Sequence, residues 1–257
     1  MMQEMKKEFK QGLRSGRLLI VMVSFLFFAV LTPVMFKVVL PTLLKSQFPE
    51  MGEQELAQMF NASQLGVVQS YLNDIFEMGT LIVSFTLCGV IAQEIKDNTL
   101  VFPLCADKRL GNIVGGKLAV YGLVLVAASL VGLLVDYLYA GLLYSFDFGV
   151  GVVIRGGLLQ GLYMVFVLAN LLLWGSLLKK PIPAGFFTLA TTFGLNFIGG
   201  LLDIKDKLPS GLLNQAMAFE GAAPSGLALT IGITLAMIAG MTVAALIRLN
   251  SLEWNTR

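Results

Sequence analysis

The sequence predicts an all-α membrane protein with six transmembrane helices, an N-terminal amphipathic helix on the membrane surface, and both termini in the cytoplasm. Its 257 residues are 56% hydrophobic and 13% charged, and the mean hydropathy is +0.80. A soluble domain carries about 25% charged residues, so this chain has too few polar side chains to cover a soluble protein of its length. Six apolar runs of membrane-spanning length support the same conclusion.

Residues 2–17 come first and predict an amphipathic helix. Its apolar positions recur at helical spacing: Met2, Met5, Phe9, Leu13 and Gly16. Its cations occupy the other faces: Lys6, Lys7, Lys10, Arg14 and Arg17. Such a helix lies on the inner membrane surface with its cations near anionic lipid head groups. The alternative is the charged start of a signal peptide, but no small-residue cleavage site closes the following apolar run.

Six apolar runs follow, and each can cross about 30 Å of hydrocarbon with ~20 residues. We expect these transmembrane helices near Leu18–Leu40, Ile75–Ala92, Leu118–Leu143, Val152–Leu178, Ala184–Leu202 and Ala228–Ile247. The longest polar connections are residues 45–74, 93–117 and 203–227, and none of them is long enough to hold an ATPase domain. We therefore expect one membrane domain over residues 1–257.

The basic residues predict the orientation. With the N-terminus inside, the inner segments hold 13 of the 18 lysines and arginines, and the outer segments hold 5. The positive-inside rule therefore places both termini and the loop 93–117 in the cytoplasm. This loop is longer and more charged than a simple turn requires, so we expect it to contact an energy-supplying partner.

The segment 203–227 is expected at the outer face, where it can dip into the outer leaflet as a re-entrant segment. One apolar face is predicted within it: Leu208, Leu212, Leu213 and Ala216. Proline and glycine break helices, and they flank this face at Pro209, Gly211, Gly221 and Pro224.

The residues present exclude several kinds of chemistry. The chain has no histidine, which rules out histidine-based triads and histidine-ligated zinc or haem. The two cysteines, Cys88 and Cys105, do not suggest a disulfide framework or a metal site. The spacing GxxxxGK occurs at residues 111–117, but Leu118 replaces the Ser or Thr that would hold magnesium. We expect no catalytic site, no metal and no nucleic-acid contact, and we interpret these glycines as helix-packing residues and Lys117 as an anchor at the inner interface.

Three polar residues fall inside the predicted spans and are candidates for a translocation path: Asp136, Asn170 and Asn196. An ionisable group at membrane depth is costly, so it usually faces protein or water. Asp136 could line a path or pair with Arg155, and the alternative is that it reaches the outer interface beside an aromatic belt. The two asparagines could equally form interhelical hydrogen bonds.

Small residues also recur at helical spacing in two predicted spans. They are Gly157 and Gly161 in the fourth, and Gly232, Ala236 and Gly240 in the last. Such seams support close helix packing, within the chain or across a dimer.

The chain resembles the type-2 ABC-exporter permease family in three places. The first is KKEFKQGLRSGRLLIVMV, residues 6–23, which is similar to that family's amphipathic helix and first membrane helix. The second is EIKDNTL, residues 94–100, which resembles the family's Glu-x-x-x-Gly-Thr-Leu with Asn98 in place of glycine. The third is IVGGK, residues 113–117, which resembles Ile-Val-x-Gly-Lys. The family's Pro-x-Ser-Arg is out of register, and Arg109 lies one residue before its arginine position.

The resemblance implies the transmembrane subunit of an ATP-driven exporter. Two such subunits, identical or paralogous, would pair with two copies of a separate ATPase that binds ATP and magnesium, while this chain would bind no cofactor and catalyse no reaction. The loop 93–117 would couple to the ATPase through Glu94, Lys96, Thr99, Leu100, Phe102 and Arg109. We expect a multi-pass protein of the cell membrane, of the bacterial inner-membrane type, with a hydrophobic or amphipathic cargo such as a drug, peptide or lipid. The competing hypothesis is a secondary transporter or a membrane scaffold without an ATPase.

Overall fold

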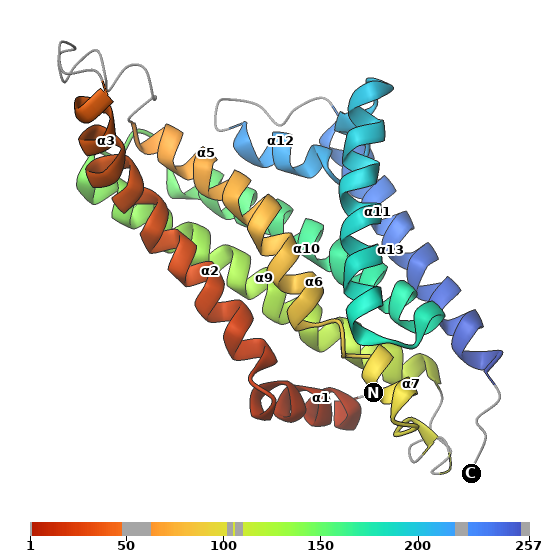
Figure 1. The fold of residues 1–257 in the computed structure, drawn as a ribbon. Coiled ribbons are helices and arrows are strands. Elements are labelled where there is room, and N and C mark those ends of the chain that lie inside the picture. Colours follow the sequence, from red (N-terminus) through yellow and green to blue (C-terminus); the bar gives the residue numbers. More distant parts are fainter. Residues whose placement is uncertain (1, 48–62, 102–104, 106–109, 219–225, 253–257) are drawn as a thin grey trace.

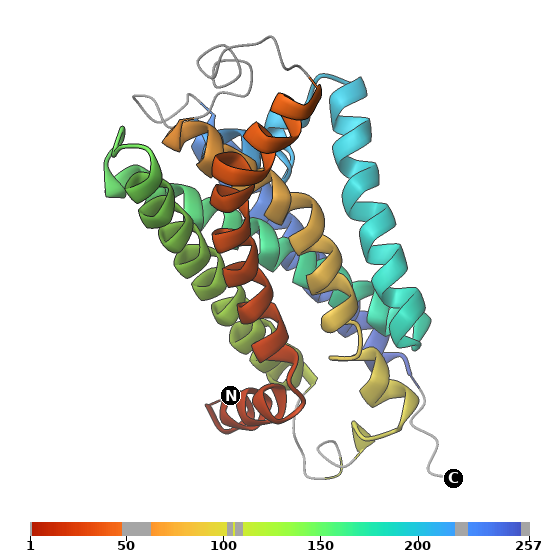
Figure 2. The same cartoon turned by 60° about the vertical axis from the view of Figure 1, so that its left-hand side comes forward.

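The computed structural model describes residues 2–47, 63–101, 105, 110–218 and 226–252, which are helical with short connecting turns. The N-terminal helix α1 (Met2–Arg14) is followed by α2 (Arg17–Val34), and Gly16 between them has a φ of 73°. Glycine adopts this left-handed conformation without a steric penalty, so the chain can turn sharply there. As a result α1 lies across one end of the helices that follow (Figures 1 and 2).

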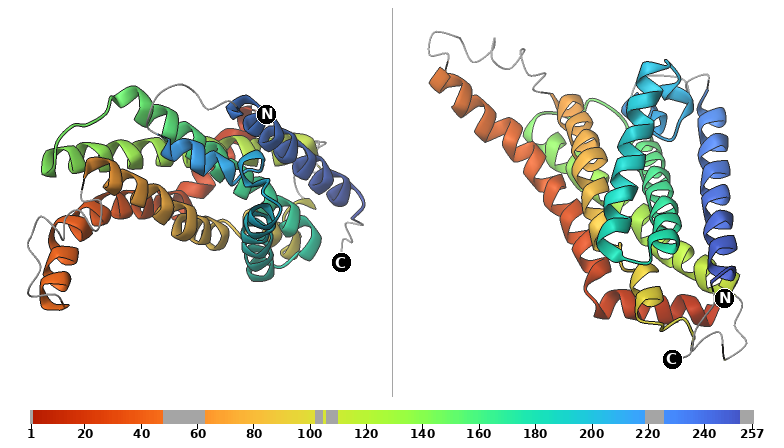
Figure 3. Two further views of the ribbon diagram at one scale, coloured as in Figure 1. Left: turned by 90° about the horizontal axis from the view of Figure 1, so that it is seen from above. Right: turned by 45° about the vertical axis from the view of Figure 1, so that its right-hand side comes forward.

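The remaining elements form a helical bundle. After α2 come the π-helical turn η1 (Met35–Val39), α3 (Leu40–Gln47), α5 (Gln64–Asp74), the π-helical turn η2 (Ile75–Gly79), α6 (Thr80–Thr86), α7 (Ala92–Lys96), α9 (Leu110–Leu143), α10 (Val150–Leu178), α11 (Pro181–Leu201), the 3₁₀ turn η3 (Lys205–Lys207), α12 (Gly211–Met217) and α13 (Leu227–Asn250). Helix α10 is central, because it packs against α9, α11, α12 and α13 (Figure 3).

The described chain makes six passes along the bundle. Helices α2 and α9 both run away from the end where α1 lies, so the chain between them must return, and α5, η2 and α6 provide that return (Figures 1 and 3). Helices α10, α11 and α13 then alternate in direction. We call the end that holds α1, α7 and the last turn of α13 the α1 end, and the end that holds α3 and α12 the α12 end.

Five of these passes are long and apolar enough to cross a membrane: Arg17–Leu43, Leu110–Leu143, Val150–Leu178, Pro181–Leu201 and Leu227–Asn250. The expected span Ile75–Ala92 is not among them, and its boundaries were wrong. The helix begins earlier, at Gln64, and ends at Thr86. Its middle carries the polar residues Asn73, Asp74 and Glu77, which lower its hydropathy.

A turn at residues 88–91 follows α6. A Cβ at Gly89 in this turn would lie 2.8 Å from Arg17 Nη2, so the guanidinium of Arg17 lies close to the backbone there. The helix ends six residues before the predicted end of the span, and the chain continues into the short helix α7.

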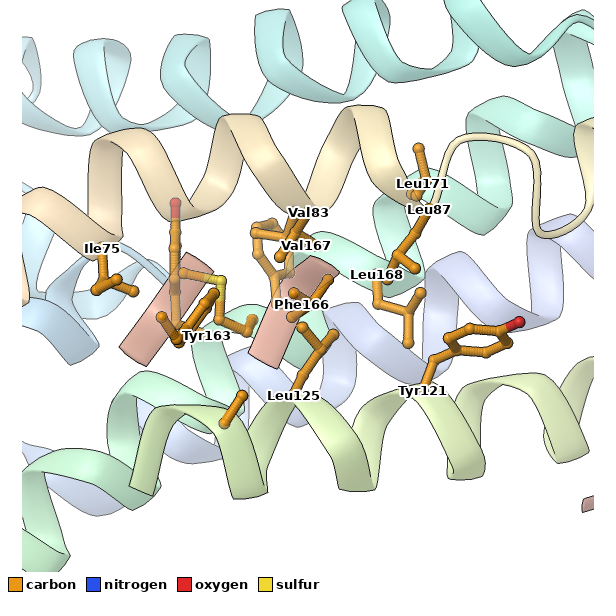
Figure 4. Packing of buried hydrophobic residues seen from close by; sticks show 14 of the residues in the cluster. Ile75, Val83, Leu87, Tyr121, Leu125, Tyr163, Phe166, Val167, Leu168 and Leu171 are labelled. Atoms are coloured by element: carbon orange, nitrogen blue, oxygen red, sulfur yellow. The ribbon is translucent and has the colours of Figure 1, made fainter. Parts of the chain in front are cut away.

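Buried apolar side chains fill the space between α6, α9 and α10 (Figure 4). Glycine brings the last two helices close together, because a Cβ at Gly161 would lie 2.9 Å from Val126 Cα and one at Gly157 would lie 3.2 Å from Leu130 Cα. This seam is therefore used within the chain. The seam on α13 differs, since neither Gly232 nor Gly240 has any neighbouring atom within 4 Å among the described residues.

The expected apolar face near residues 208–216 is confirmed for three of its four members. Leu212, Leu213 and Ala216 of α12 are buried, while Leu208 is half-buried. Helix α12 packs against α10, α5 and α13 at the α12 end. Gly221 and Pro224, the expected breakers on its far side, lie outside the described residues.

Candidate functional site

A buried lysine joins three elements at the α1 end. Lys117 lies near the start of α9, and its side chain is 1% exposed. Its ammonium donates a hydrogen bond of 2.8 Å to Glu8 Oε2 on α1 and a second, also 2.8 Å, to Glu94 Oε1 on α7. The side chains of Glu8 and Glu94 are 1% and 13% exposed. We call these three residues the Lys117 cluster.

The glycines before Lys117 are part of this arrangement. Residues 110–117 are the first turns of α9, so GxxxxGK is helical here and forms no phosphate-binding loop. A Cβ at Gly116 would lie 3.3 Å from Glu4 Cβ, which shows how closely α1 lies against α9. The expectation that glycine permits close packing is confirmed for Gly116, but Lys117 is buried in the protein and does not anchor a helix end at an interface.

Helix α1 presents three different faces. The face toward the bundle carries Glu4, Glu8 and Gly12, all of them buried. The apolar residues Met2, Phe9 and Leu13 are 75%, 46% and 47% exposed. The predicted basic residues are also exposed: Lys6, Lys7, Lys10 and Arg14. A helix that docks through its acidic stripe keeps its apolar face free for lipid and its cations free for anionic head groups.

The charges of the Lys117 cluster do not balance, because one ammonium faces two carboxylates. Glu8 Oε1 is buried without a hydrogen-bond partner. Burial raises the pKa of the Glu8 carboxyl above its ordinary value of 4.5, even though the neighbouring Lys117 ammonium lowers it and Glu94 acts in the opposite sense. Because Lys117 interacts with both Glu94 and Glu8, its positive charge does not offset the full cost of removing the Glu8 carboxylate from water.

The turn after α7 explains the unusual asparagine in the sequence. Asn98 has a φ of 54°, and the Thr99 backbone N–H donates to the carbonyl of Glu94 over 3.0 Å. This bond closes a helix C-cap in which glycine is the usual left-handed residue and asparagine is the best-tolerated substitute. Asn98 therefore preserves the backbone that a glycine would give.

The predicted coupling residues divide into four groups. Glu94 belongs to the Lys117 cluster, and Lys96 and Thr99 are exposed. Leu100 is 2% exposed, so its side chain packs within this chain and is not an accessible anchor for a partner. Phe102 and Arg109 lie outside the described residues.

The three candidates for a translocation path do not share one site. Asn170 Nδ2 bonds to three acceptors on α11, the nearest being Thr191 Oγ1 at 2.7 Å, so it links two helices. Asn196 is half-buried on α11 and its Oδ1 has no partner. The pairs Gly157–Leu130 and Gly161–Val126 set the register of α10 on α9, which puts Asn170 about 28 Å of helix away from Asp136.

Two of the three expectations for Asp136 are wrong. The residue is 0% exposed, so it does not reach the surface. Arg155 donates to the carbonyl of Ala218 over 2.6 Å and does not pair with it, and both Asp136 carboxylate oxygens lack a hydrogen-bond partner among the described residues. That Asp136 lines a path stays a prediction.

Comparison with known proteins gives no identity. No family model matches this chain, and no curated protein matches it. The candidate site therefore rests on its geometry alone.

Glu8 and Lys117 were missed as partners at the sequence level. A signal was present, because Glu4 and Glu8 are one helical turn apart in a helix that is otherwise basic. Acidic residues at this spacing lie on one face of the helix. In a helix whose other charged residues are basic, such an acidic face indicates a different environment from that of the rest of the helix. Their partner could not be read, since Lys117 is separated from Glu8 by 109 positions.

Removing the positive charge should destabilise the α1 end strongly. We expect Lys117→Met to lower the free energy of unfolding by about 3–5 kcal/mol, because it leaves two buried carboxylates uncompensated. The triple variant Glu8→Gln/Lys117→Met/Glu94→Gln should recover most of this loss, since no buried charge remains. Thermal unfolding of the purified chain in detergent measures both, with Lys96→Met as the exposed control. A triple variant no more stable than Lys117→Met would contradict the role assigned to the cluster.

The Glu8 carboxyl should make stability depend on pH. Its pKa is raised in the folded protein, so the folded state binds the proton more tightly, and this stabilisation is lost as the pH rises from 4.5 through the folded pKa. Glu8→Gln mimics the protonated acid and removes the dependence. We therefore expect the melting temperature of the wild type, relative to Glu8→Gln, to fall as the pH rises above 4.5. A constant difference across this rise would show that the Glu8 carboxyl does not have a raised pKa in the folded protein.

Proposed function

We propose that this chain is the transmembrane subunit of an ATP-driven exporter and couples to a separate ATPase subunit at its α1 end. Two copies of the chain, or the chain and a paralogue, would pair with two ATPases in the cell membrane, and both termini would be cytoplasmic. Five helices of membrane-spanning length support a multi-pass membrane protein. The return pass α5–η2–α6 would be the sixth crossing.

The Lys117 cluster is the observation that carries this proposal. An exporter of this type needs a rigid connection between the loop that an ATPase pushes and the helices that line the path. Lys117 of α9 lies at the end of the loop 93–117 and bonds to Glu94 of α7 at its start, and the same side chain holds α1. A push on α7 would therefore reach α9 and α1 together, without passing through residues 97–109 between them.

The exposed surface of α7 suits contact with a partner. Lys96 and Thr99 are exposed at its C-terminal end, close to the buried Glu94. A contact at this rim sets orientation and partner choice through charge, while the buried cluster behind it transmits displacement. ATP and magnesium would be bound by the partner, and this chain would supply the path.

The seam on α13 is available for a second transmembrane subunit. Gly232, Ala236 and Gly240 are exposed and lie one turn apart on the same helix face. Small residues at this spacing let two membrane helices approach closely. The seam on α10 is already filled by α9, so α13 is the surface we assign to pairing.

The competing function is a secondary transporter, and the buried carboxylate of Asp136 is the observation that favours it. Carriers use unpaired intramembrane carboxylates as coupling sites. Dependence of transport on ATP in reconstituted vesicles separates the two functions. A scaffold without an ATPase would show neither ATP-driven nor gradient-driven transport.

Reversing one exposed charge near α7 should weaken ATPase binding. We expect Lys96→Glu to lower affinity for the proposed ATP-binding cassette ATPase partner by roughly tenfold, because an acidic side chain replaces the basic one that would steer the partner at the rim. The matched control is Lys207→Glu, an exposed lysine at the α12 end. Co-purification and surface binding of the detergent-solubilised complex measure both variants.

The outcome separates the proposal from its alternatives. Equal losses for Lys96→Glu and Lys207→Glu would mean that α7 is not the contact surface. If no ATPase co-purifies with the wild type, the exporter proposal itself fails and the secondary transporter or scaffold remains.

A further inference from the structure

A second polar site lies toward the α12 end, between α2, α5 and α9. It comprises Thr32, Tyr71, Asp74 and Asp136, and we call it the Asp136 site. Its two carboxylates face no lysine or arginine among the described residues, since Arg155 bonds to a backbone carbonyl and Lys37 lies over the ring of Tyr144 at 4.9 Å. Burying a carboxylate without a counter-charge costs several kcal/mol, so the site favours either a proton on the carboxyl or a positively charged occupant.

Tyr71 points directly into this site. It is 0% exposed and its hydroxyl has no hydrogen-bond partner. The hydroxyl lies against Gly132 of α9, where any Cβ would overlap it, and the carbonyl oxygen of Phe25 lies 3.5 Å from the same Cβ position. Gly132 is one helical turn before Asp136, and side chains on a helix lean toward its N-terminus. The Asp136 carboxylate therefore leans toward the Tyr71 hydroxyl.

Asp74 completes the site from the other side. It lies three residues after Tyr71 on the same face of α5, and Thr32 Oγ1 of α2 donates to its Oδ2 over 2.9 Å. Asp74 and Tyr71 are both close enough to Asp136 to interact with it electrostatically. The oxygens of the site thus come from three helices, and the apolar residues that adjoin Tyr71 and Gly132 along the chain, Leu72 and Leu133, are buried.

Two π-helical turns adjoin the site. On α2, η1 begins at Met35, directly after Thr32, Pro33 and Val34, and on α5, η2 begins at Ile75, directly after Asp74. Proline in a helix removes a backbone hydrogen bond, and π-helical turns are frequent at functional sites. The Thr32–Asp74 hydrogen bond thus joins α2 and α5 where both helices are irregular. The two helices can separate there to admit an occupant.

We infer that the Asp136 site binds the charged group of a lipophilic organic cation, with Asp136 as counter-ion and the Tyr71 hydroxyl and ring beside it. An organic ammonium or phosphonium group needs few oxygen contacts and is stabilised by aromatic and apolar surroundings. A metal ion needs more ligands, and no group of three or more Cys, Asp or Glu side chains in the described residues is arranged to hold one. As cargo recognition, the assignment rests on the proposed export function.

Binding of tetraphenylphosphonium to the purified chain, without any ATPase, tests this inference by equilibrium dialysis in detergent. We expect Asp136→Asn to weaken binding at least tenfold and Tyr71→Phe to weaken it about threefold. The matched control is Asp203→Asn, the same chemical change at an exposed position near the α12 end whose φ of 55° suits asparagine equally well. It should bind like the wild type. Uncharged triphenylphosphine oxide should bind no more weakly to Asp136→Asn than to the wild type.

Three results would overturn the inference. The first is an unchanged affinity of Asp136→Asn for tetraphenylphosphonium. The second is that Asp136→Asn loses as much affinity for the uncharged analogue as for tetraphenylphosphonium. The third is that sodium chloride displaces the probe more effectively than choline chloride at equal ionic strength, which would indicate an alkali-metal site. If Asp136→Asn does not fold, Tyr71→Phe decides, and unchanged affinity there overturns the inference. Because the assay contains no ATPase, its failure leaves the exporter proposal standing, and failure of ATPase binding leaves this site standing.

Discussion

The ammonium of Lys117, held between two carboxylates, is the interaction on which the α1 end depends. Without it, the bundle-facing stripe of α1 would bury Glu8 against helix α9 without the ammonium that it bonds to, and Glu8 would favour water. The glycines at 12 and 116 permit close contact between the two helices, but closeness alone does not stabilise an acidic surface. The docking of α1, the position of α7 and the start of α9 are therefore conditional on one side chain.

This dependence gives the cluster a mechanical meaning. Glu8 and Glu94 bind the same ammonium from two different elements, so a displacement of α7 must either carry α9 with it or break a buried charge pair. Breaking such a pair is expensive, so the movement that costs less is the concerted one. The cluster thus favours motion of α1, α7 and α9 as one body. The conformational change would then take place mainly in the irregular parts of α2 and α5, where the π-helical turns lie.

Local patterns predicted much of the fold because apolar run length is a local property. The run at Val152–Leu178 coincides with α10 almost to the residue. The run at Ile75–Ala92 failed because the exposed Asn73 and Glu77 and the half-buried Asp74 interrupt the apolar signal in the middle of this pass, whose helix begins at Gln64 and ends at Thr86. The periodicity of α1 predicted an amphipathic helix, and the structure shows Phe9 and Leu13 exposed and Glu4 and Glu8 buried. In a membrane protein an apolar face can be satisfied by lipid, and the polar face must find a partner inside. Periodicity identifies the faces of such a helix, but it does not tell which one docks.

The two buried polar sites show this principle in opposite forms. At the α1 end, the lysine that neutralises the carboxylates is part of the chain, so the site can be permanently closed and can act as a structural joint. At the Asp136 site, the chain supplies carboxylates, a hydroxyl and a carbonyl but no cation. A buried acidic site without a resident counter-charge is stabilised when the carboxyl takes up a proton or when a bound cation provides the charge, and either of these is removable where a lysine is not. About 28 Å of helix α9 separates the two sites. This one helix therefore connects the Lys117 cluster, where the ATPase would act, to the Asp136 site, where the cargo would be released.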